Sequence, residues 1–551
     1  MNPFKRLWEL IKLEKQEVWS IYYYSVLSGL LQLTVPVGIQ AIIGFVMGAT
    51  MVTSIYVLSL LVVLGVLLVG ILQINQMKII EKIQQNIFVR YAFDFAEKIP
   101  RFDLIKLDSY YLPEKVNRIF EAINVQKGIS KLLLDIPTAS IQIIFSLILL
   151  SLYHSIFILF GFLLLAVLYL MVRLTAKKGI RTSLQESGYK YEVVAWLQEM
   201  GRVIKSFKFS QGSQMNLKKT DENVHEYVLS RTAHFKVLLL QYRALVFFKV
   251  MITASMLIVG TNLLINQQIN IGEFIAAEIV ILTIINAVEK LIGSLDSIYD
   301  VITGLEKLAS VTESVLEKEG STILGRQENG LRVELINFSF EYPKQKLIFR
   351  DFSILVPEGS TVCISGAEGA GKTTFLKILS GNYSNFSGAL LIDNKPIHQY
   401  KLESLRKQLG VYLLQEDIFK GTLFENISMG RASVTDMSIM QVANNLGIDF
   451  FKQLFQIGFD CAIDNAGKRP SSSMIKKILL LRALVDKPPL LLLEEPWLGL
   501  EIGMKDRITN YILHHTKNAT VFITSNDESF AKKCDYKMLI DNREVTLLRN
   551  I

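Results

Sequence analysis

Two groups of residues in the second half of the chain could do chemistry on a phosphate. The first is "GAEGAGKTT", Gly366 to Thr374, which lies between the strand-like "STVCISG" and the helix-like "TTFLKILSG". Glycines let backbone N–H groups approach an anion, and a helix N-terminus adds partial positive charge. In such a cradle Lys372 would reach the β and γ phosphates, and Thr373 would bind Mg²⁺.

The second group is a pair of carboxylates in "LLLLEEPWLGLE", Leu490 to Glu501. Glu494 and Glu495 follow a run of leucines. One interpretation is a buried strand that ends in two solvated glutamates. The other is the acidic edge of a nucleotide-hydrolysing site, where a carboxylate polarises the attacking water. The position of the pair after the phosphate cradle favours the second interpretation.

The elements before these motifs are apolar. The chain has 551 residues, half of them hydrophobic, and no charged residue occurs in Val18–Met77 or Ile136–Val172. A helix needs roughly 20 residues to cross the hydrocarbon of a bilayer, so each run predicts two spans, with outer turns near residues 48–53 and 153–155. Val250–Ile265 and Phe274–Val288 predict two more, which gives six.

The charge distribution predicts the orientation of the spans. Lys and Arg gather at the ends expected to face the cytosol, and the three outer loops hold none. Both termini are therefore expected in the cytosol, and the net charge of +8 largely reflects topology. The sequence after the spans has no Lys/Arg stripe interleaved with aromatic residues, which argues against nucleic acid as a partner.

These patterns predict the fold class: a six-helix α membrane domain followed by an α/β P-loop nucleotide-binding domain. The expected boundaries are a helix in the membrane interface (1–17), the membrane domain with long cytosolic helix extensions (18–310), a linker (311–330) and the nucleotide-binding domain (331–551). Phe4 and Trp8 alternate with lysines at helical spacing in the first segment. A frayed cytosolic tail is the alternative there. The three cysteines have no metal-ligand spacing, so we expect reduced thiols.

At this point the order of motifs resembles the ATP-binding-cassette (ABC) transporter family, exporter type, over essentially the whole chain. The resemblance implies that Tyr342 stacks on adenine and that Gln415, in "VYLLQEDIFKGTLFENI", senses the γ-phosphate. It also implies that Glu495 is the general base. The implied nucleotide-binding residues are Tyr342, Gly366, Gly369, Gly371, Lys372, Thr373, Thr374 and Ser471, and the implied Mg²⁺ ligands are Thr373, Gln415 and Glu494.

The cassette departs from the family pattern at several positions. Glu494 replaces an Asp in the Mg²⁺ shell, and Asn526, in "TVFITSND", replaces the switch histidine. The signature Leu-Ser-Gly-Gly-Gln aligns with "PSSSM", which keeps Ser471 and has serines at both glycine positions. Glu501 stands where the following loop usually has Asp. Asn can donate a hydrogen bond but cannot carry charge. We therefore predict ATP binding and only slow hydrolysis, or none.

The resemblance predicts an exporter half-transporter in a bacterial inner membrane, with ATP, Mg²⁺ and membrane lipid bound. Its partner would be an identical chain or a second half-transporter with a consensus cassette. The alternative is an ATP-binding, hydrolysis-deficient subunit that gates or regulates a catalytic partner. The sixth span resembles exporters that work with a periplasmic adaptor, which implies that adaptor and a peptide or protein cargo. We expect no peptidase domain before the first span.

Overall fold

A computed structural model of the chain describes residues 3–48, 52–107, 112–210, 213–343, 347–448, 458–463 and 470–550. Contacts divide the chain into two compact units. The helical unit consists of Met1–Pro100 and Ser109–Ser314, and the sheet unit consists of Arg101–Asp108 and Val315–Ile551.

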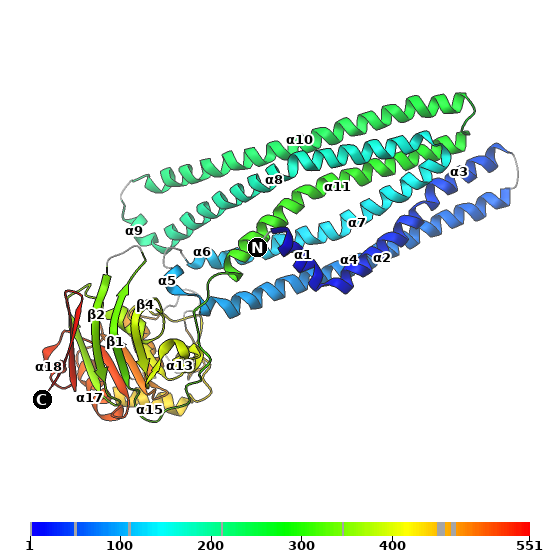
Figure 1. Ribbon diagram of the computed structural model, residues 1–551. Helices are drawn as coiled ribbons and strands as arrows, with labels where there is room; N and C mark the ends of the chain where they lie inside the picture. Colours follow the sequence, from blue (N-terminus) through cyan, green and yellow to red (C-terminus); the bar gives the residue numbers. More distant parts are fainter. Residues whose placement is uncertain are drawn as a thin grey trace. The chain divides into compact units, whose positions relative to one another are not determined.

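Long helices build the helical unit (Figure 1). In chain order they are α1 (Pro3–Leu13), α2 (Lys15–Gln32), α3 (Thr34–Met47), α4 (Val52–Lys98), α6 (Leu112–Asn117), α7 (Glu121–Tyr153), α8 (Ile156–Arg202), α9 (Ile204–Lys208), α10 (Met215–Ile265) and α11 (Ile271–Thr312). The break between α2 and α3 has a local cause. Pro36 has no backbone N–H, so the carbonyl of Gln32 loses the partner that a continuous helix would supply.

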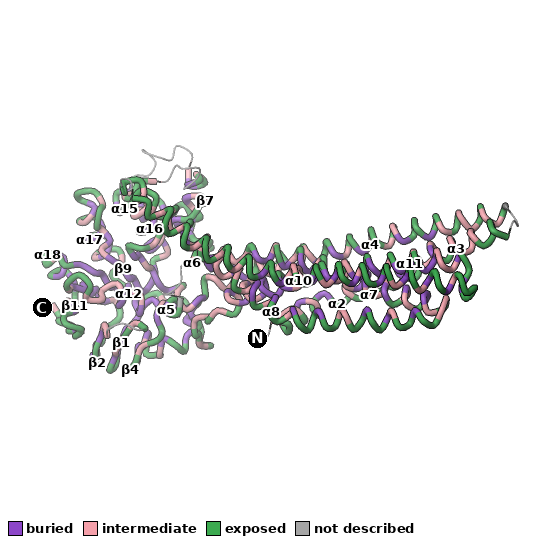
Figure 2. Tube along the Cα trace, turned by 90° about the horizontal axis from the view of Figure 1, so that it is seen from above, coloured by how far each residue is buried: buried purple, intermediate pink, exposed green. Residues whose placement is uncertain are grey.

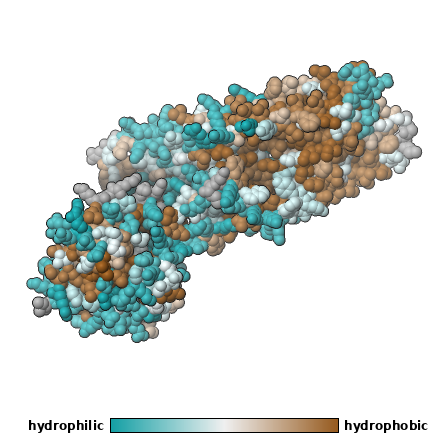
Figure 3. Space-filling model, viewed as in Figure 1, coloured by the Kyte–Doolittle hydropathy of each residue, from teal (hydrophilic) through white to brown (hydrophobic). Residues whose placement is uncertain are grey.

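Six helical segments of the described chain are long and apolar enough to cross a membrane, as the sequence predicts. They are Lys15–Met47, Thr53–Arg101, Leu112–Tyr153, Ile156–Arg202, Met215–Ile265 and Ile271–Thr312. In Figure 3, brown apolar surface covers the end of the helical unit that carries α3, and polar surface covers its opposite end. The chain is therefore a multi-pass membrane protein whose helices continue beyond the apolar region.

Helices α7 and α11 form the centre of the helical unit, and Figure 2 shows buried residues concentrated along them. Half of the most apolar window of α11 is buried, against 6% for α4. Small residues allow the close approach. A Cβ added at Gly128 of α7 would lie 2.3 Å from Val301 Cγ2, and one at Gly304 of α11 would lie 2.7 Å from Val125 Cγ2. The outward apolar face of α4 is left for lipid.

The sheet unit contains two main sheets. One is antiparallel, in the order β2 (Leu347–Val356), β1 (Val333–Glu341), β4 (Phe386–Ile392) and β5 (Lys395–Pro396). The other has the order β12 (Glu544–Arg549), β11 (Tyr536–Asp541), β3 (Thr361–Gly366), β10 (Thr520–Thr524), β9 (Leu490–Glu494) and β6 (Leu409–Tyr412), and all its neighbours except β12 are parallel. A short pair joins β7 (Gly421–Thr422) and β8 (Ala462–Ile463).

The sheet unit also contains helices. They are α12 (Lys372–Leu379), α13 (Leu402–Arg406), α14 (Leu423–Ser428), α15 (Asp436–Leu446), α16 (Ser472–Leu484), α17 (Met504–His515) and α18 (Glu528–Ala531). Along β9, Leu491 and Leu493 pack into one hydrophobic core, and Leu490 and Leu492 pack into the other. A strand buried on both faces needs apolar residues at every position, which explains the leucine run.

Candidate functional site

The predicted motifs meet at one edge of the parallel sheet. Thr524 at the end of β10 pairs with Glu494 of β9 and with Ile364 of β3. Tyr412 at the end of β6 pairs with Leu493 of β9. The carboxyl ends of these four strands therefore share an edge, where ligands bind in open parallel sheets. Segments far apart in the sequence are brought together because each follows one of these strands.

The backbone of the predicted cradle requires glycine at three positions. A Cβ at Gly366 would lie 2.4 Å from the Ile540 carbonyl oxygen. Gly369 and Gly371 have φ of 79° and 104°, in the left-handed region that side chains disfavour. A Cβ at Gly371 would also lie 2.7 Å from Ile348 Cγ2. Gly371 is the N-cap of α12, so the loop leads directly into a helix N-terminus.

Side chains of the cradle contact the loop itself. The Lys372 ammonium donates to the carbonyls of Gly366 and Ala367, at 2.6 and 3.0 Å. Its charge therefore lies over the loop, where a phosphate bound by the backbone amides would meet it.

Tyr342 lies beside the start of α12. Its hydroxyl is 3.0 Å from Thr374 Oγ1, and the ring makes edge contacts with Phe340 and Tyr383. The side chain is half-buried, which leaves part of the aromatic ring available to a base. This is the place where the resemblance puts the adenine-stacking residue.

Glu494 connects the cradle to the segment after β6. It is 8% exposed. Its Oε1 accepts a hydrogen bond from the Thr373 hydroxyl, and its Oε2 accepts one from the Leu414 amide at 2.8 Å. The carboxylate is therefore fully engaged by neutral donors. Its Oε1 therefore lies against the hydroxyl that is predicted to bind Mg²⁺.

Glu495 has an unusual backbone. Its φ is 42°, and its amide donates to the carbonyl and hydroxyl of Thr524, at 3.3 and 3.1 Å. A glutamate in the left-handed region costs about 1 kcal/mol or more, and such strain concentrates at functional sites. Its carboxylate makes no hydrogen bond within the described chain. A general base needs this freedom, because it must accept a proton from water.

Asn526 and Gln415 also contact the cradle region. Asn526 Oδ1 accepts a hydrogen bond from the Gly366 amide at 3.0 Å. Gln415 Oε1 accepts one from the Lys377 ammonium of α12 at 3.2 Å. Each side chain therefore reaches the loop or the helix that follows it. The structure places all the predicted cradle-side residues within one connected set of contacts.

The signature segment is built at the start of α16. Ser471 is the helix N-cap, and its hydroxyl accepts a hydrogen bond from the Met474 amide at 3.3 Å. Ser472 is exposed, whereas the Ser473 hydroxyl is buried without a partner in the described chain. Glu501 accepts a hydrogen bond from Lys477 of α16 at 2.7 Å, and this contact lowers the pKa of its carboxyl.

Glu416, next to Gln415, is a half-buried acid that no sequence motif marks. Burial raises the pKa of Glu416 to about 7, although the nearby Arg482 opposes the shift and Glu494 adds to it. Glu416 lines a cavity of about 270 Å³ together with Tyr412, Ser472 and Lys476. Tyr412 is 1% exposed, and its hydroxyl has no partner among the described residues. No spacing signal marks Glu416, because its pKa depends on residues that only the fold brings near.

Two connecting segments also belong to the sheet unit. Phe102 pairs with Leu316 in an antiparallel bridge, and Arg101 forms an ion pair with Glu319. We call residues 101–107 and 315–319 the clip, because they form this bridge after α4 and after α11.

Arg406 contacts both the clip and the loop after α12. Its guanidinium binds both oxygens of Glu317, at 2.6 and 2.7 Å, and donates to the Gly381 carbonyl and Asn382 Oδ1. Tyr383, the neighbour of Tyr342, follows directly. No spacing along the chain predicts this arrangement, since its members are far apart in the sequence.

Comparison with known proteins identifies the architecture. Residues 349–498 match the family described as ABC transporter. Over its whole length the fold resembles a bacterial Atm1-family ABC exporter solved with ATP bound, with a TM-score of 0.86, 16% identity, and coverage of 97% of this chain and 94% of the other. Residues 349–498 therefore match an ABC transporter domain, and the chain as a whole has the fold of an ABC exporter. The sheet unit is its cassette.

Curated relatives are similar over part of the chain. A putative multidrug export ATP-binding/permease protein YgaD of Bacillus subtilis is 28% identical over 281 residues, 50% of this chain and 48% of its own. A beta-(1-->2)glucan export protein NdvA of Agrobacterium vitis is 27% identical over 53% and 51%. A glutathione/L-cysteine transport protein CydC of Haemophilus influenzae is 29% identical over 42% and 41%. The chain thus spans about half of the length of each of these relatives.

Proposed function

We propose that the half-transporter binds ATP at the cassette, pairs with a second cassette-bearing chain, and moves a substrate out of the cytosol as the two cassettes close and separate. One observation carries the proposal. The cradle from Gly366 to Thr374, Glu495 and Asn526 lie together at one sheet edge, in a chain that also has six membrane-spanning helices.

The chemistry of the cradle suits a nucleoside triphosphate. Backbone amides around Gly369 and Gly371 and the N-terminus of α12 would hold the phosphates, with Lys372 supplying positive charge. Tyr342 would take the base. The ABC transporter family match itself implies ATP as the nucleotide.

The donor set also fits Mg²⁺. Thr373, Glu494 and Gln415 offer a hydroxyl, a carboxylate and an amide oxygen, and Mg²⁺ prefers oxygen ligands. When bound, the ion would neutralise charge on the phosphates. Because the Thr373 hydroxyl donates its proton to Glu494, the lone pairs of its oxygen remain available to the ion.

Hydrolysis is expected to be slow. Glu495 has a free carboxylate to orient and deprotonate water. Asn526 can hold a phosphate oxygen by a hydrogen bond but cannot supply charge. In the partner's site, Ser472 and Ser473 would add side chains where two glycines allow close backbone approach to phosphate.

The export direction rests on the architecture and on what the relatives' names say of those proteins. Their named substrates differ, so a peptide or protein cargo remains a prediction from the sixth span. Cytosolic termini and an inner-membrane location remain predictions from the Lys and Arg distribution. The proposal includes no periplasmic adaptor, because none of the comparisons supports one.

Closure of two chains on ATP is the step to test. Glu495→Gln keeps the shape of the side chain and removes the base, so Mg-ATP should trap a closed dimer. Native mass spectrometry of the full chain in detergent would then show two chains and two nucleotides, and Lys372→Ala should not form this species. Monomers in every nucleotide state would contradict homodimer closure and direct the search to a consensus partner.

A further inference from the structure

A small cavity in the helical unit is lined almost entirely by oxygen-bearing side chains. Its volume is about 140 Å³, and it lies between α7, α8 and α11. The lining residues are Glu121 and Asn124 of α7, Ser183, Glu186, Ser187 and Lys190 of α8, and Asp300 and Thr303 of α11. Three carboxylates and one lysine make the lining acidic. The nucleotide chemistry described above uses none of these residues.

Most of the lining groups already have partners. Glu121 accepts hydrogen bonds from Lys190 at 2.6 Å, from Asn124 at 2.8 Å and from Tyr191 at 2.9 Å. Glu186 forms an ion pair with Arg231 at 2.9 Å. The hydroxyls of Ser183 and Thr303 bond to each other at 2.8 Å.

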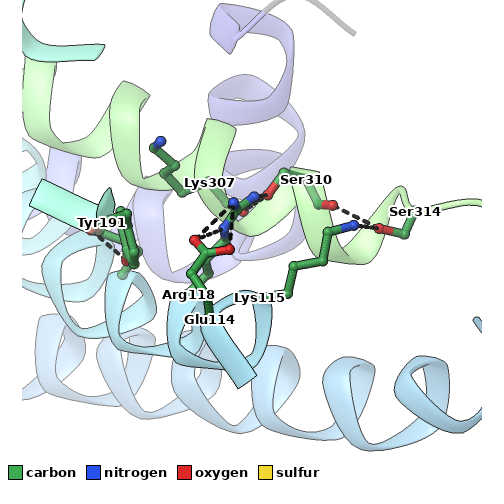
Figure 4. A network of polar contacts seen from close by, with 8 residues as sticks. Glu114, Lys115, Arg118, Tyr191, Lys307, Ser310 and Ser314 are labelled. Atoms are coloured by element: carbon green, nitrogen blue, oxygen red, sulfur yellow. Dashed lines mark hydrogen bonds and ion pairs between the residues drawn. The ribbon is translucent and has the colours of Figure 1, made fainter. Parts of the chain in front are cut away.

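The neighbouring polar network, shown in Figure 4, is also occupied by the chain's own charges. Arg118 is held by Glu114 and Ser310, and Lys115 donates to Ser314. Arg118, Lys190 and Lys307 all lie within 6 Å of the Tyr191 ring centre. A ligand would find neither a free acid nor a free aromatic face in this network.

Two groups in the cavity remain without partners among the described residues. Ser187 is 6% exposed, and its hydroxyl makes no hydrogen bond. A serine or threonine inside a helix commonly bonds to the carbonyl four residues earlier, as Thr182 does in the same helix. Asp300 has neither a hydrogen bond nor an ion pair in the described chain. A buried hydroxyl without a partner costs about 1–3 kcal/mol, so a ligand is expected to satisfy Ser187.

The lining restricts what that ligand can be. An anion would meet three carboxylates. A divalent metal needs about six oxygen ligands, yet Glu121 is already engaged, and no group of three metal-ligating residues occurs in the described chain. The remaining acceptors suit N–H donors that carry positive charge. The volume is below the roughly 300 Å³ at which pockets hold a drug-sized molecule, so only a headgroup fits.

We propose that Asp300 and Ser187 bind the ammonium or guanidinium group of an organic cation, with the carboxylate supplying the charge and the hydroxyl a second acceptor. That this cation is the charged end of a transported molecule rests on the proposed export function. The binding itself does not. An ethanolamine lipid headgroup has the same chemistry and is the other source to distinguish.

Calorimetry on the full chain tests the site, in nanodiscs that contain phosphatidylglycerol and phosphatidylcholine but no primary amine. The probe is cadaverine, and 1,5-pentanediol is the uncharged probe of equal length. Cadaverine should bind and pentanediol should not. Asp300→Asn should weaken cadaverine binding about tenfold or more, and Ser187→Ala about threefold. Glu289→Gln, on the same helix but paired with Lys249, should change it less than twofold.

Equal binding by Asp300→Asn, equal binding of pentanediol, or no binding of cadaverine would overturn the inference. Adding phosphatidylethanolamine separates the two sources: competition with cadaverine in the wild-type chain supports the lipid, and its absence supports a soluble cation. Thermal stabilisation by ATP, measured on the same samples, is independent of the cavity. If ATP still stabilises the chain while cadaverine fails to bind, the cation site is refuted and the proposed function is not.

Discussion

The two regions of the cassette that would contact nucleotide differ in how well their side chains are satisfied. On the cradle side, Lys372, Thr373 and Asn526 all have hydrogen-bond partners within the loop, its helix or the adjoining strand ends. At the signature, Ser471 caps α16, but the Ser473 hydroxyl is buried with no partner among the described residues. The cradle side chains are thus paired, whereas one signature hydroxyl has no partner in the part of the chain that the structure describes.

The difference follows from what each region must recognise. The cradle holds phosphates through glycine backbone and one lysine, and these residues match the family pattern. In the proposed dimer the signature would act on a nucleotide bound to the other chain, and there two serines replace glycines. We therefore expect ATP binding and closure to persist while hydrolysis is slowed. On this proposal the substitutions would separate binding from turnover.

Loss of the cradle lysine should have the largest effect. Lys372→Ala removes the positive charge over the Gly366 to Ala370 loop, and we expect ATP affinity to fall about 100-fold. Equilibrium binding of labelled ATP to the full chain measures it. Lys395→Ala, an exposed lysine on β5, is the matched control. Unchanged affinity in Lys372→Ala would show that the cradle does not hold the phosphates.

A test of the cradle backbone comes next. Gly371→Ala adds a Cβ 2.7 Å from Ile348 at a φ of 104°, which should destabilise the cassette by about 2–3 kcal/mol. Gly430→Ala separates the two causes, because its φ is 74° and no atom lies within 4 Å. It should cost only about 1 kcal/mol. Equal losses of melting temperature in the two variants would show that packing at Gly371 is unimportant.

Restoring the signature should change turnover and leave binding unchanged. Ser472→Gly with Ser473→Gly removes both side chains, and we expect ATP hydrolysis by the full chain to rise about tenfold, roughly 1.4 kcal/mol of barrier. The affinity for ATP should stay within twofold of the parent. A rise in affinity without a rise in turnover would contradict the division between the two regions.

Glu416 lines a cavity with Ser472 of the signature helix and gives the smallest expected effect. Because burial raises the pKa of Glu416 to about 7, the folded chain binds its proton more tightly than the unfolded chain. The resulting stability is fully present below about pH 4.5 and is lost as pH rises through about 7. Melting curves should show that the free energy of unfolding of the parent chain falls by on the order of 1 kcal/mol between pH 5 and 8. Glu416→Gln should not show this loss. Parallel pH profiles of the two proteins would refute this.

The sequence predicted the architecture well because its signals are local. Two long uncharged runs and two shorter apolar stretches predict the six spans, and Gly366 to Thr374 joins a strand to a helix in consecutive residues. The leucines before Glu494 mark a strand buried on both faces.

What the sequence could not predict depends on long-range contacts. The bridge from Glu494 to Thr373 and Leu414, the Arg406–Glu317 pair and the cavity that Asp300 and Ser187 share join residues from different elements. No spacing along the chain encodes such neighbours. The positive φ of Glu495 is likewise imposed by the strand end, because Thr524 fixes its amide.

The central claim is that this chain binds ATP but turns it over slowly without a consensus partner. Mg-ATP hydrolysis by the full chain in nanodiscs, measured beside Glu495→Gln and at saturating ATP, tests it most directly. The account predicts bound ATP with a turnover below about 0.1 s⁻¹, well under the roughly 10 s⁻¹ typical of enzymes, and a further loss in Glu495→Gln. Turnover near 10 s⁻¹ that depends on Glu495 would contradict it, because Glu494, Asn526 and the signature serines would then be fully tolerated.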